Sequence, residues 1–410
     1  MSPRDLHARL VALASEPHLS DLMALLNPAG EETRIVGGAI RNTILGEKTN
    51  DIDLSTTLLP DAVLRLAQAA GWHGVPTGIE HGTVTLIRDI HAFEVTTLRE
   101  DIETDGRHAK VRFGRDFRAD AARRDFTINA LSLDRDHKLH DYFEGVHDLR
   151  LHKVRFIGRA DQRLREDYLR GLRFLRFSAE YGRGRLDSLG LAAVLNHRGG
   201  FVELSRERIR AEMMKLVDAR HAAEVIKKAE EFGLITQLLG VPADPAAFAA
   251  RIALEGRFGE MRVPRLARFA ALGVHDDRNI AYLRESMRLT NAEERWLHRI
   301  IDVQYRFRRD GLASLLLLGP EEAEIGVEAL RREASARGSV SLLLDIDRVA
   351  NPPVFHLSGK DALALGVVAG PAVGQALEAT RTTWAREGFP PGYADQHAIL
   401  AGVIRRMRER

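Results

Sequence analysis

The sequence of 410 residues predicts an α+β protein, in which a small mixed β-sheet head is followed by an all-helical remainder. Two observations lead to this fold class. Short apolar runs with strand-like alternation, separated by glycine turns, occupy residues 34–143. From about Leu149 the pattern changes to long apolar-periodic segments rich in Arg, Leu, Ala and Glu, which is typical of helices. A chain of this length is expected to form two or more domains with buried cores.

The elements of the head can be assigned in chain order. Residues 1–33 are expected to be a helical lead-in, and a helix is expected from Ala39 to about Leu45. The predicted strands are Arg34–Val36, Asp51–Ser55, Thr83–Arg88, Ala92–Thr97, and a pair formed by Ser132–Leu133 and Leu139–Tyr142. Turns are predicted at Gly74, Gly78, Gly82 and residues 104–107.

Composition limits the class of protein. The chain is 45% hydrophobic and 29% charged, as expected for a globular protein, and it contains no cysteine. Disulfides and cysteine-ligated zinc sites are therefore excluded, and a cytoplasmic location is expected. The longest apolar stretch, residues 312–318, is too short to cross a bilayer. No membrane association and no obligate protein partner are predicted.

Charge is unevenly distributed along the chain. The formal net charge is only +2, but residues 150–185 contain eleven Lys/Arg and four Asp/Glu, a local net charge of +7. Such a basic segment is typical of a binding surface for RNA or for a triphosphate. The alternative is an ordinary solvated helix face.

The stretch VGGAIRNTILGEKTNDIDLS, residues 36–55, indicates a site for a metal-bound nucleoside triphosphate. Gly37 and Gly38 allow the backbone to approach a ligand closely, and the following helix N-terminus favours phosphate. Asp51 and Asp53 are two residues apart, so on a strand they point to one face and suit Mg²⁺. Glu94, on another predicted strand, is a candidate third carboxylate. The competing interpretation is a turn or a surface strand edge for the Asp pair, and an ordinary surface strand acid for Glu94.

Two arginine-containing motifs complete the candidate site. In RRDFTINAL, residues 123–131, the paired arginines are predicted at the start of a helix, with Asp125 holding them; an ordinary capping ion pair is the alternative. In REDYLRGLRFLRFSAEYG, residues 165–182, Asp167 and Arg170 are predicted to be neighbours on one helix. Arg173 and Arg176 continue at the same interval. A salt-bridged amphipathic helix is the alternative here.

An Asp beside an Arg can distinguish nucleotide bases by their hydrogen-bond donors and acceptors. Cytosine and adenine both present an amino donor next to a ring-nitrogen acceptor, whereas uracil and guanine present a carbonyl next to an N–H. The pair Asp167 and Arg170 could therefore accept C and A and reject U and G, by the logic of direct base readout.

With these motifs in order, the chain resembles the class II tRNA nucleotidyltransferases, the CCA-adding enzymes, which share a polymerase-beta-like head with bacterial poly(A) polymerases. The resemblance runs from about Ile35 to Val217 and includes VGGAIRN, DIDL, HGTVT, FEVTTLREDIETDGRHAKV, RRDFTINAL, REDYLRGLRFLRF and LSRERIRAEMMKLV. It implies template-independent addition of CCA to the 3′ end of tRNA, with CTP and ATP as substrates, tRNA as partner and two Mg²⁺ ions as cofactors.

The resemblance also implies residue roles. Asp51 and Asp53 would bind the metals with Glu94 nearby, and Gly38 and Arg41 would contact the nucleotide. Arg124 would contact the sugar. Asp167 and Arg170 would recognise the base edge with help from Glu166, and Arg173 and Arg176 would lie along the triphosphate.

Further segments and the domain limits follow from the same resemblance. Residues 99–111 resemble the flexible loop needed for adding the final A, and residues 205–217 resemble the segment that steadies the base-reading helix. One departure is Asn42, where the family usually has Asp; this removes a charge and any ion pair made with it. The expected domains are a catalytic head at 1–143, a base-recognition neck at 144–220, a body at 221–300 and a tRNA-binding tail at 301–410.

Several alternatives remain open at this stage. A poly(A) polymerase would share every head motif, although the short basic end RRMRER argues mildly against it. A partial enzyme would add only CC or only A. A non-catalytic RNA-binding protein would carry a degenerate head, which the intact Asp51 and Asp53 do not favour. The isolated pairs His147-Asp148 and His275-Asp276 are expected to have surface or capping roles rather than to mark a metal phosphohydrolase.

Overall fold

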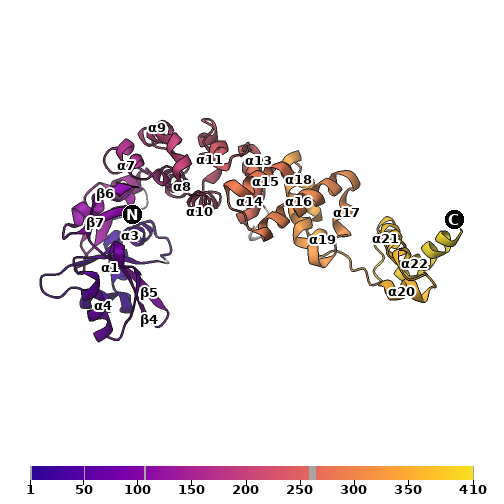
Figure 1. The fold of residues 1–410 in the computed structure, drawn as a ribbon, viewed down its shortest axis with the longest axis horizontal. Helices are drawn as coiled ribbons and strands as arrows, with labels where there is room; N and C mark the ends of the chain where they lie inside the picture. The colour runs from indigo at the N-terminus through magenta and orange to yellow at the C-terminus, as the bar shows by residue number, and fades with distance from the viewer. Residues whose placement is uncertain (1, 50, 106–107, 258–264, 410) are drawn as a thin grey trace. The chain divides into compact units, whose positions relative to one another are not determined.

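The computed structural model describes residues 2–49, 51–105, 108–257 and 265–409, and the chain divides into two compact units, Met1–Leu238 and Leu239–Arg410 (Figure 1). Each unit is described by itself. The first contains all the strands found among the described residues, and the second is helical throughout its described part. The predicted α+β class is therefore confirmed. The finer division at residues 143, 220 and 300 remains a prediction.

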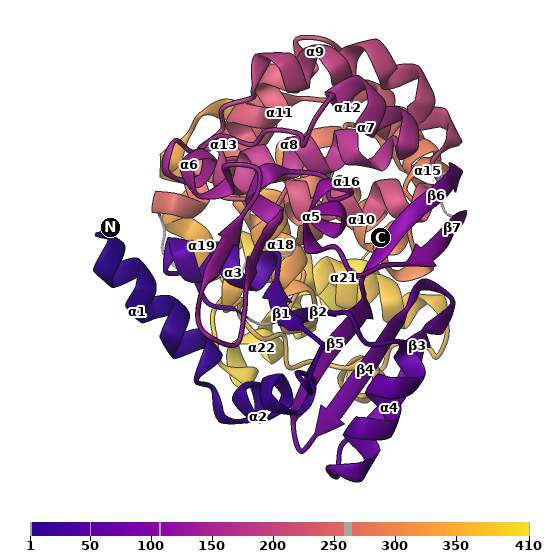
Figure 2. The ribbon, with the colours of Figure 1, turned by 90° about the vertical axis from the view of Figure 1, so that its left-hand side faces the viewer.

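A seven-stranded mixed sheet forms the centre of the head (Figure 2). Its strands, in spatial order, are β3 (His73–Gly78), β4 (Thr83–Arg88), β5 (His91–Thr97), β2 (Asp53–Thr56), β1 (Thr33–Val36), β8 (Leu131–Leu133) and β9 (Leu139–Asp141). The pairing of β2 with β5 is parallel, and the other pairings are antiparallel. Two of the predicted acids lie on central strands, Asp53 on β2 and Glu94 on β5.

A second, two-stranded sheet is formed by β6 (Arg99–Asp105) and β7 (His108–Phe113), which are antiparallel. This ribbon occupies the segment predicted to be a flexible loop, and its residues 106–107 lie outside the described part of the chain. Two further differences from prediction concern the strands. β3 forms where Gly74 and Gly78 were predicted to be turns, and β2 begins at Asp53, so that Asp51 precedes the strand.

The helices of the first unit precede, interrupt and follow the strands along the chain. They are α1 (Pro3–Ala14), α2 (Pro17–Leu25), α3 (Gly38–Leu45), α4 (Pro60–Ala69), α5 (Phe117–Ala122), α6 (Gly145–Arg150), α7 (Ala160–Glu166), α8 (Leu169–Tyr181), α9 (Ser188–His197), α10 (Arg206–Leu216), α11 (Ala222–Glu230) and α12 (Leu234–Leu239). Proline in the first turn begins α1, α2 and α4, where its missing N–H costs nothing.

Alternating burial explains why the sheet presents acids on one face. Phe93 and Val95 of β5 are buried against the core, and Glu94 between them is exposed. Further along the chain, an aromatic cluster fixes the helical part of the unit, because the Phe126 ring lies 5.0 to 6.4 Å from the rings of Phe156, Phe174 and Phe177. This cluster joins the segment after α5 to α8.

The second unit consists of α13 (Pro245–Arg257), α14 (Arg265–Gly273), α15 (Asp277–Ser286), α16 (Asn291–Asp310), α17 (Leu312–Leu316), α18 (Ala323–Arg337), α19 (Ile346–Ala350), α20 (Gly359–Ala364), α21 (Pro371–Arg386) and α22 (Tyr393–Arg408). One buried cluster unites α16 to α19, and another unites α20 to α22. Among the helices that the structure describes, none is both long enough and apolar enough to cross a membrane.

The two His-Asp pairs have structural roles. Asp276 caps α15 by accepting the Asn279 N–H at 2.9 Å, as expected. Asp148 differs from expectation, because its side chain is buried rather than exposed and accepts hydrogen bonds from Thr127 Oγ1 and Arg155 Nε. It braces the 3₁₀ turn Thr127–Asn129 against α6.

Candidate active site

A glycine turn between β1 and α3 forms one wall of the candidate site. Gly37 has φ of +69°, a conformation that favours glycine, and its N–H donates to Leu131 O at 3.0 Å. A Cβ on Gly37 would lie 2.8 Å from Arg124 Nη1, and one on Gly38 would lie 3.4 Å from Arg41 Nη2. The two glycines therefore allow two guanidinium groups to lie against the turn.

The predicted acids lie beside this turn. Asp53 is registered opposite Val36 of β1 on one side and opposite Glu94 of β5 on the other. Asp51 is exposed and precedes β2. The described residues contain two groups of three ligands with atoms within 4.8 Å of one another, and neither includes Asp51, Asp53 or Glu94. The three carboxylates thus lie at the start of β2 and on the neighbouring strand β5, without forming a tight cluster. This part of the sheet is named the Asp51–Asp53 edge.

The electrostatics of this edge favour a bound cation. Partial burial and then the negative charge of Glu94 raise the pKa of the Asp53 carboxyl, with a smaller contribution from Asp51, while Arg124 acts in the opposite direction. A raised pKa means that the ionised carboxylate lacks sufficient positive charge around it. Carboxylate oxygens on neighbouring strands are ligands that suit a hard divalent cation. The residues present therefore fit such a metal.

The paired arginines lie at the end of a helix, not at the start of one as predicted. Arg123 is the C-terminal cap of α5, and the segment after Asp125 forms a 3₁₀ turn and then β8. The acid that holds both arginines is Asp120, which accepts from Arg123 Nε at 2.8 Å and from Arg124 Nη2 at 3.4 Å. Arg124 also reaches Ser55 Oγ at 3.4 Å. This network places Arg124 directly next to β2.

Asp125 has a different partner from the one predicted. Its Oδ2 accepts from Arg173 Nε at 2.7 Å, so it joins α8 to the segment after α5. Burial, the largest single influence, acts to raise the pKa of Asp125, but the charge of Arg173 and the hydrogen bonds from Arg173, Asn129 and the Phe126 N–H together lower it. Burial is also the largest influence on Arg173 and acts to lower its pKa, but Asp125, with smaller contributions from Glu212 and Asp167, raises it overall. The two groups form an ion pair in which Asp125 is buried and Arg173 is partly exposed to the cavity.

Arg41 is held by amide side chains. It is buried, its Nη1 donates to Asn129 Oδ1, and its Nε donates to Asn42 Oδ1 at 3.1 Å. Its guanidinium lies 4.1 Å from the centre of the Tyr181 ring, and burial lowers its pKa. Asn42, which stands where the family usually has Asp, therefore keeps the contact with Arg41 but contributes no charge.

The predicted base-reading residues stand at a break between two helices. α7 ends at Glu166 and α8 begins at Leu169, so Asp167 is an extended residue rather than part of one continuous helix. Asp167 Oδ1 accepts the Leu169 N–H at 3.0 Å, and Oδ2 accepts from Arg208 Nη2 of α10 at 2.7 Å. Because of this break, the backbone of Asp167 is extended. The two hydrogen bonds hold both of its carboxylate oxygens in place.

Arg170 is fixed separately from Asp167. Its Nη1 donates to Glu166 Oε2 at 2.5 Å and to Arg163 O at 3.0 Å. Glu166 is not among the described residues that line the cavity, and its carboxylate also pairs with Arg163 Nη1. Glu166 therefore orients Arg170, and its predicted assistance in reading the base would act through Arg170. Further along α8, Arg176 Nε pairs with the buried Glu212 at 2.5 Å.

One cavity of about 690 Å³ brings most of these groups together. Nine of the eleven predicted site residues line it, namely Gly38, Arg41, Asp51, Asp53, Arg124, Asp167, Arg170, Arg173 and Arg176. Glu94 and Glu166 lie outside this lining. Sequence reasoning did not single out Lys48, Asn129, Phe177 and Lys215, which also line the cavity. Asn129 and Lys215 fall inside motifs already noted, TINAL and MMKLV, where a polar residue in an apolar run was the available signal.

The chain matches two known domain families. Residues 33–155 match the Poly A polymerase head domain, and residues 201–244 match the probable RNA and SrmB-binding site of polymerase A. The first match contains the glycine turn, the acids and the paired arginines. The second match includes Arg208, which holds Asp167.

Relatives of known function match most of the chain. The mitochondrial CCA tRNA nucleotidyltransferase 1 of Mus musculus is 34% identical over 385 residues, which cover 90% of this chain and 87% of the relative. The corresponding Homo sapiens protein is 33% identical with the same coverage. The CCA-adding enzyme of Oceanobacillus iheyensis is 37% identical over 230 residues, covering 55% of this chain and 56% of the relative.

Solved structures match the whole fold. The Bacillus stearothermophilus CCA-adding enzyme in complex with CTP has a TM-score of 0.73 and 26% identity, covering 100% of this chain and 99% of that one. The Thermotoga maritima CCA-adding enzyme complexed with tRNA gives the same TM-score at 19% identity, covering 98% of both chains. The second likeness is evidence of fold alone.

Proposed function

Because the chain belongs to the family of CCA-adding tRNA nucleotidyltransferases, we propose that its 690 Å³ cavity is where CTP and ATP are joined to the 3′ end of tRNA. The enzyme extends tRNA by C, C and A, using CTP and ATP. The observation that carries the assignment of the site is that one cavity contains both the Asp51–Asp53 edge and the Asp167–Arg170 pair. The first suits phosphoryl chemistry, and the second suits recognition of a base.

In the reaction, the tRNA 3′-hydroxyl forms a bond to the α-phosphorus of the nucleotide, and the bond between the α- and β-phosphates breaks. Pyrophosphate leaves, and the hydroxyl proton passes to solvent or to a carboxylate. We assign Asp51 and Asp53 to holding the divalent metal, with Glu94 beside them. The metal proposed is Mg²⁺, since the donors are carboxylate oxygens, and when bound it offsets negative charge on the attacking and leaving oxygens.

The arginines of the cavity are assigned to the rest of the nucleotide. Gly38 begins α3, whose free N–H groups favour phosphate, and Arg41 lies against it. Arg124, next to β2, is assigned to the sugar. Arg173 and Arg176 are assigned to the triphosphate, since Asp125 and Glu212 hold them rigidly in the cavity wall. Preformed charge of this kind needs no rearrangement when the substrate arrives.

Base selection is assigned to Asp167 and Arg170. An ionised Asp167 accepts from the amino group of cytosine or adenine, and Arg170 donates to the adjacent ring nitrogen. Uracil and guanine would place a carbonyl oxygen next to the carboxylate. Polar groups of the enzyme would then be left without hydrogen-bond partners, which is unfavourable. Arg208 and Glu166 position this pair through the contacts at 2.7 Å and 2.5 Å.

The location and the later domains are also part of the proposal. The cytoplasm is proposed as the location, and subcellular fractionation would test it, because the animal relatives carry the word mitochondrial in their names. Residues 1–143, 144–220, 221–300 and 301–410 are proposed as head, neck, body and tail, with the tail gripping tRNA.

A primer-extension assay tests the function. Purified protein and Mg²⁺ are combined with tRNA lacking CCA, tRNA ending in CC, and an unstructured RNA, each with labelled CTP, ATP, UTP or GTP and with CTP plus ATP. We expect two C's and one A on the first tRNA, one A on the second, and no use of UTP or GTP. Long A tails on the unstructured RNA would indicate a poly(A) polymerase instead, and addition that stops at CC, or that requires CC, would indicate a partial enzyme.

A further inference from the structure

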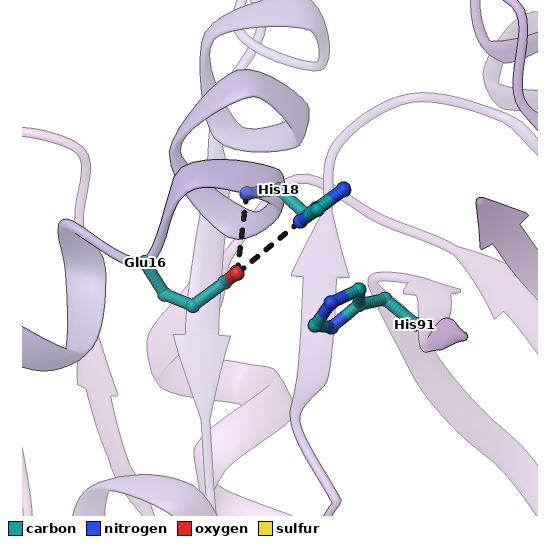
Figure 3. A group of neighbouring side chains, drawn as sticks. All are labelled: Glu16, His18 and His91. Atoms are coloured by element: carbon teal, nitrogen blue, oxygen red, sulfur yellow. Dashed lines mark hydrogen bonds and ion pairs between the residues drawn. The ribbon is translucent and has the colours of Figure 1, made fainter. Parts of the chain in front are cut away.

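A second group of metal-ligating side chains lies outside the nucleotide cavity. Glu16, His18 and His91 come from separate places in the sequence, yet one ligand atom from each lies within 4.8 Å of the others (Figure 3). Glu16 is the N-cap of α2, His18 lies in its first turn, and His91 is the first residue of β5. None of the three is among the described residues that line the nucleotide cavity.

The spacing of the group suits a small tetrahedral ion. Glu16 Oε1 lies 3.4 Å from His18 Nδ1. Zinc bonds of about 2.0–2.1 Å to nitrogen and oxygen in a tetrahedral site separate two ligand atoms by about 3.3–3.4 Å. The His91 ring stacks on the His18 ring, with centres 4.2 Å apart and planes inclined by 22°. One edge of a coordination tetrahedron is therefore already present, and the His91 ring must tilt out of the stack for its nitrogen to reach the same ion.

His18 lies between two carboxylates. Its Nε2 faces Asp89 Oδ2 at 3.3 Å, and its Nδ1 faces Glu16 Oε1 at 3.4 Å. A metal ion bound to Nδ1 would leave Nε2–H to donate to Asp89, because an ionised carboxylate can only accept. A metal-bound histidine whose second nitrogen donates to a carboxylate is the arrangement that orients such ligands in proteins.

Glu16 is held in place before any ion binds. Its carboxylate accepts the backbone N–H groups of His18 at 3.3 Å and Leu19 at 2.7 Å. The buried Phe93 ring lies parallel to His91, and the buried Trp72 ring meets His18 edge-on, with ring centres 6.4 Å apart in both pairs. Backbone hydrogen bonds thus fix Glu16, and buried aromatic rings lie next to the two histidines.

The other tight group of potential ligands is less suitable. In Glu32, Asp134 and His140, the Glu32 carboxylate is already neutralised by Arg34 at 2.6 Å. Asp134 pairs with His140 at 2.8 Å and also caps its own turn by accepting from the Lys138 N–H. Binding a metal there would require the Glu32–Arg34 ion pair to be broken, and among the described residues the Glu16 group contains no arginine pair of this kind.

We propose that Glu16, His18 and His91 bind a divalent transition-metal ion of the zinc type, with Asp89 orienting His18. Two imidazoles and one carboxylate select zinc-like ions over Mg²⁺, which prefers oxygen ligands alone. The ion connects α2 to β5 and so stabilises the head, since it binds the folded chain and not the dispersed ligands of the unfolded one. The site is separate from the Asp51–Asp53 edge and contributes no group to the reaction.

The test is a Zn²⁺ titration of the full-length protein after treatment with EDTA. An Asp53→Asn background weakens competing binding at the catalytic edge, and a chromophoric chelator reports the free metal. We expect one equivalent to bind at micromolar concentration or tighter, to raise the melting temperature, and to give the visible spectrum of a tetrahedral ion when Co²⁺ replaces Zn²⁺. His18→Ala, His91→Ala and Glu16→Gln should each weaken binding by at least about tenfold.

His73→Ala is the matched control, because His73 is an exposed histidine of the same sheet, and its loss should change nothing. Glu16→Gln keeps an oxygen that can cap α2, so its loss of metal affinity would not reflect an unfolded helix. Zn²⁺ binding that is unchanged in His18→Ala and His91→Ala, or that occurs only at millimolar concentration, would overturn the proposal. Binding lost in His140→Ala rather than in His91→Ala would also overturn it.

Discussion

The Asp53 carboxylate lowers the stability of the folded state, although it is a residue of the candidate active site. Its neighbours Glu94 and Asp51 are also acids, and Arg124 offsets them only in part, so the pKa of Asp53 is raised. A group whose pKa is raised on folding favours the folded state when it is protonated. That contribution is present below the unfolded pKa of about 4 and is lost as pH rises through the folded value. At neutral pH the charged side chain therefore costs stability.

The first prediction concerns Asp53→Asn in the metal-free protein. The variant should melt at a higher temperature than the natural chain at pH 7, because it lacks the unfavourable charge, and the difference should disappear below about pH 4. Nucleotide addition should fall by at least about 100-fold, since the metal supplies several kcal/mol of charge stabilisation. Thermal unfolding in EDTA at several pH values and primer extension measure the two effects.

A matched control for Asp53→Asn is Asp136→Asn. The Asp136 side chain is 85% exposed and lies outside the cavity, so its variant should change neither the activity nor the pH dependence of melting. If Asp53→Asn melted below the natural chain in EDTA at pH 7, the assignment of an unfavourable charge to Asp53 would be wrong.

The second prediction concerns Arg208, a positioning residue that holds Asp167 Oδ2 at 2.7 Å. In Arg208→Gln the carboxylate loses a charged donor, and a hydrogen bond to a charged group contributes about 1.5–3 kcal/mol. The preference for CTP over UTP should therefore fall by about tenfold or more, while Arg208→Lys should recover part of it. The ratio of kcat/KM for the two nucleotides measures the effect. An equal loss for CTP and UTP would point to a purely structural role.

At the scale of elements, the sequence predicted the parts that depend on local chemistry. The glycine turn before α3 and the strand after it follow from residue type, because only glycine adopts the φ of +69° at Gly37 without strain. The prediction was wrong where tertiary contacts decide. β3 forms despite Gly74 and Gly78 because β4 pairs with it, and the arginines at 123–124 end a helix because Asp120, three and four residues earlier, holds them.

Ion-pair partners were the least predictable feature of the site. The excess positive charge of residues 150–185 suggested a basic surface, but Arg173 and Arg176 are paired with Asp125 and Glu212, which lie outside that segment. Local spacing could suggest that Asp167 and Arg170 are neighbours. It could not show that Arg208, 41 residues away from Asp167, holds one of them, because that contact depends on how α8 packs against α10.

The third prediction concerns the close approach of α6 to the turn that carries Asn129. A Cβ on Gly145 would lie 2.3 Å from the backbone oxygen of Thr127, which cannot move aside like a flexible side chain. Gly145→Ala should therefore destabilise the protein by about 1–3 kcal/mol, as overpacking does, and lower activity by displacing the cavity wall. Denaturant unfolding and primer extension measure these effects.

Gly374→Ala makes the same chemical change, but it is expected to raise stability rather than lower it. Gly374 is exposed within α21, and an added Cβ there meets nothing within 4 Å. This variant should be more stable by about 0.5–1 kcal/mol, because alanine is the better helix former. Equal effects of the two substitutions would contradict the steric argument for Gly145.

For the whole molecule, the nucleotide cavity belongs to one of the two compact units. Every residue that lines the nucleotide cavity lies between Gly37 and Lys215, inside the first unit. The second unit has cores of its own, formed by α16 to α19 and by α20 to α22. A nucleotide is small enough to be bound by one unit, whereas tRNA is long and offers phosphates over a wide surface. We therefore propose that the tail at 301–410 contributes to tRNA affinity rather than to chemistry.

The last prediction follows from this separation. A fragment of residues 1–238 should fold, bind CTP within about threefold of the full-length affinity, and keep the preference for CTP over UTP, because its cavity is complete. Its KM for tRNA should rise at least about tenfold, since even one or two lost phosphate contacts cost about 1.4 kcal/mol or more, and its tRNA affinity should depend less steeply on salt. Isothermal titration with CTP, and kinetics on tRNA at several salt concentrations, measure these quantities. A folded fragment with an unchanged KM for tRNA would place the tRNA-binding surface in the first unit, while a fragment that folds but no longer binds CTP would show that the second unit is needed for the nucleotide site itself.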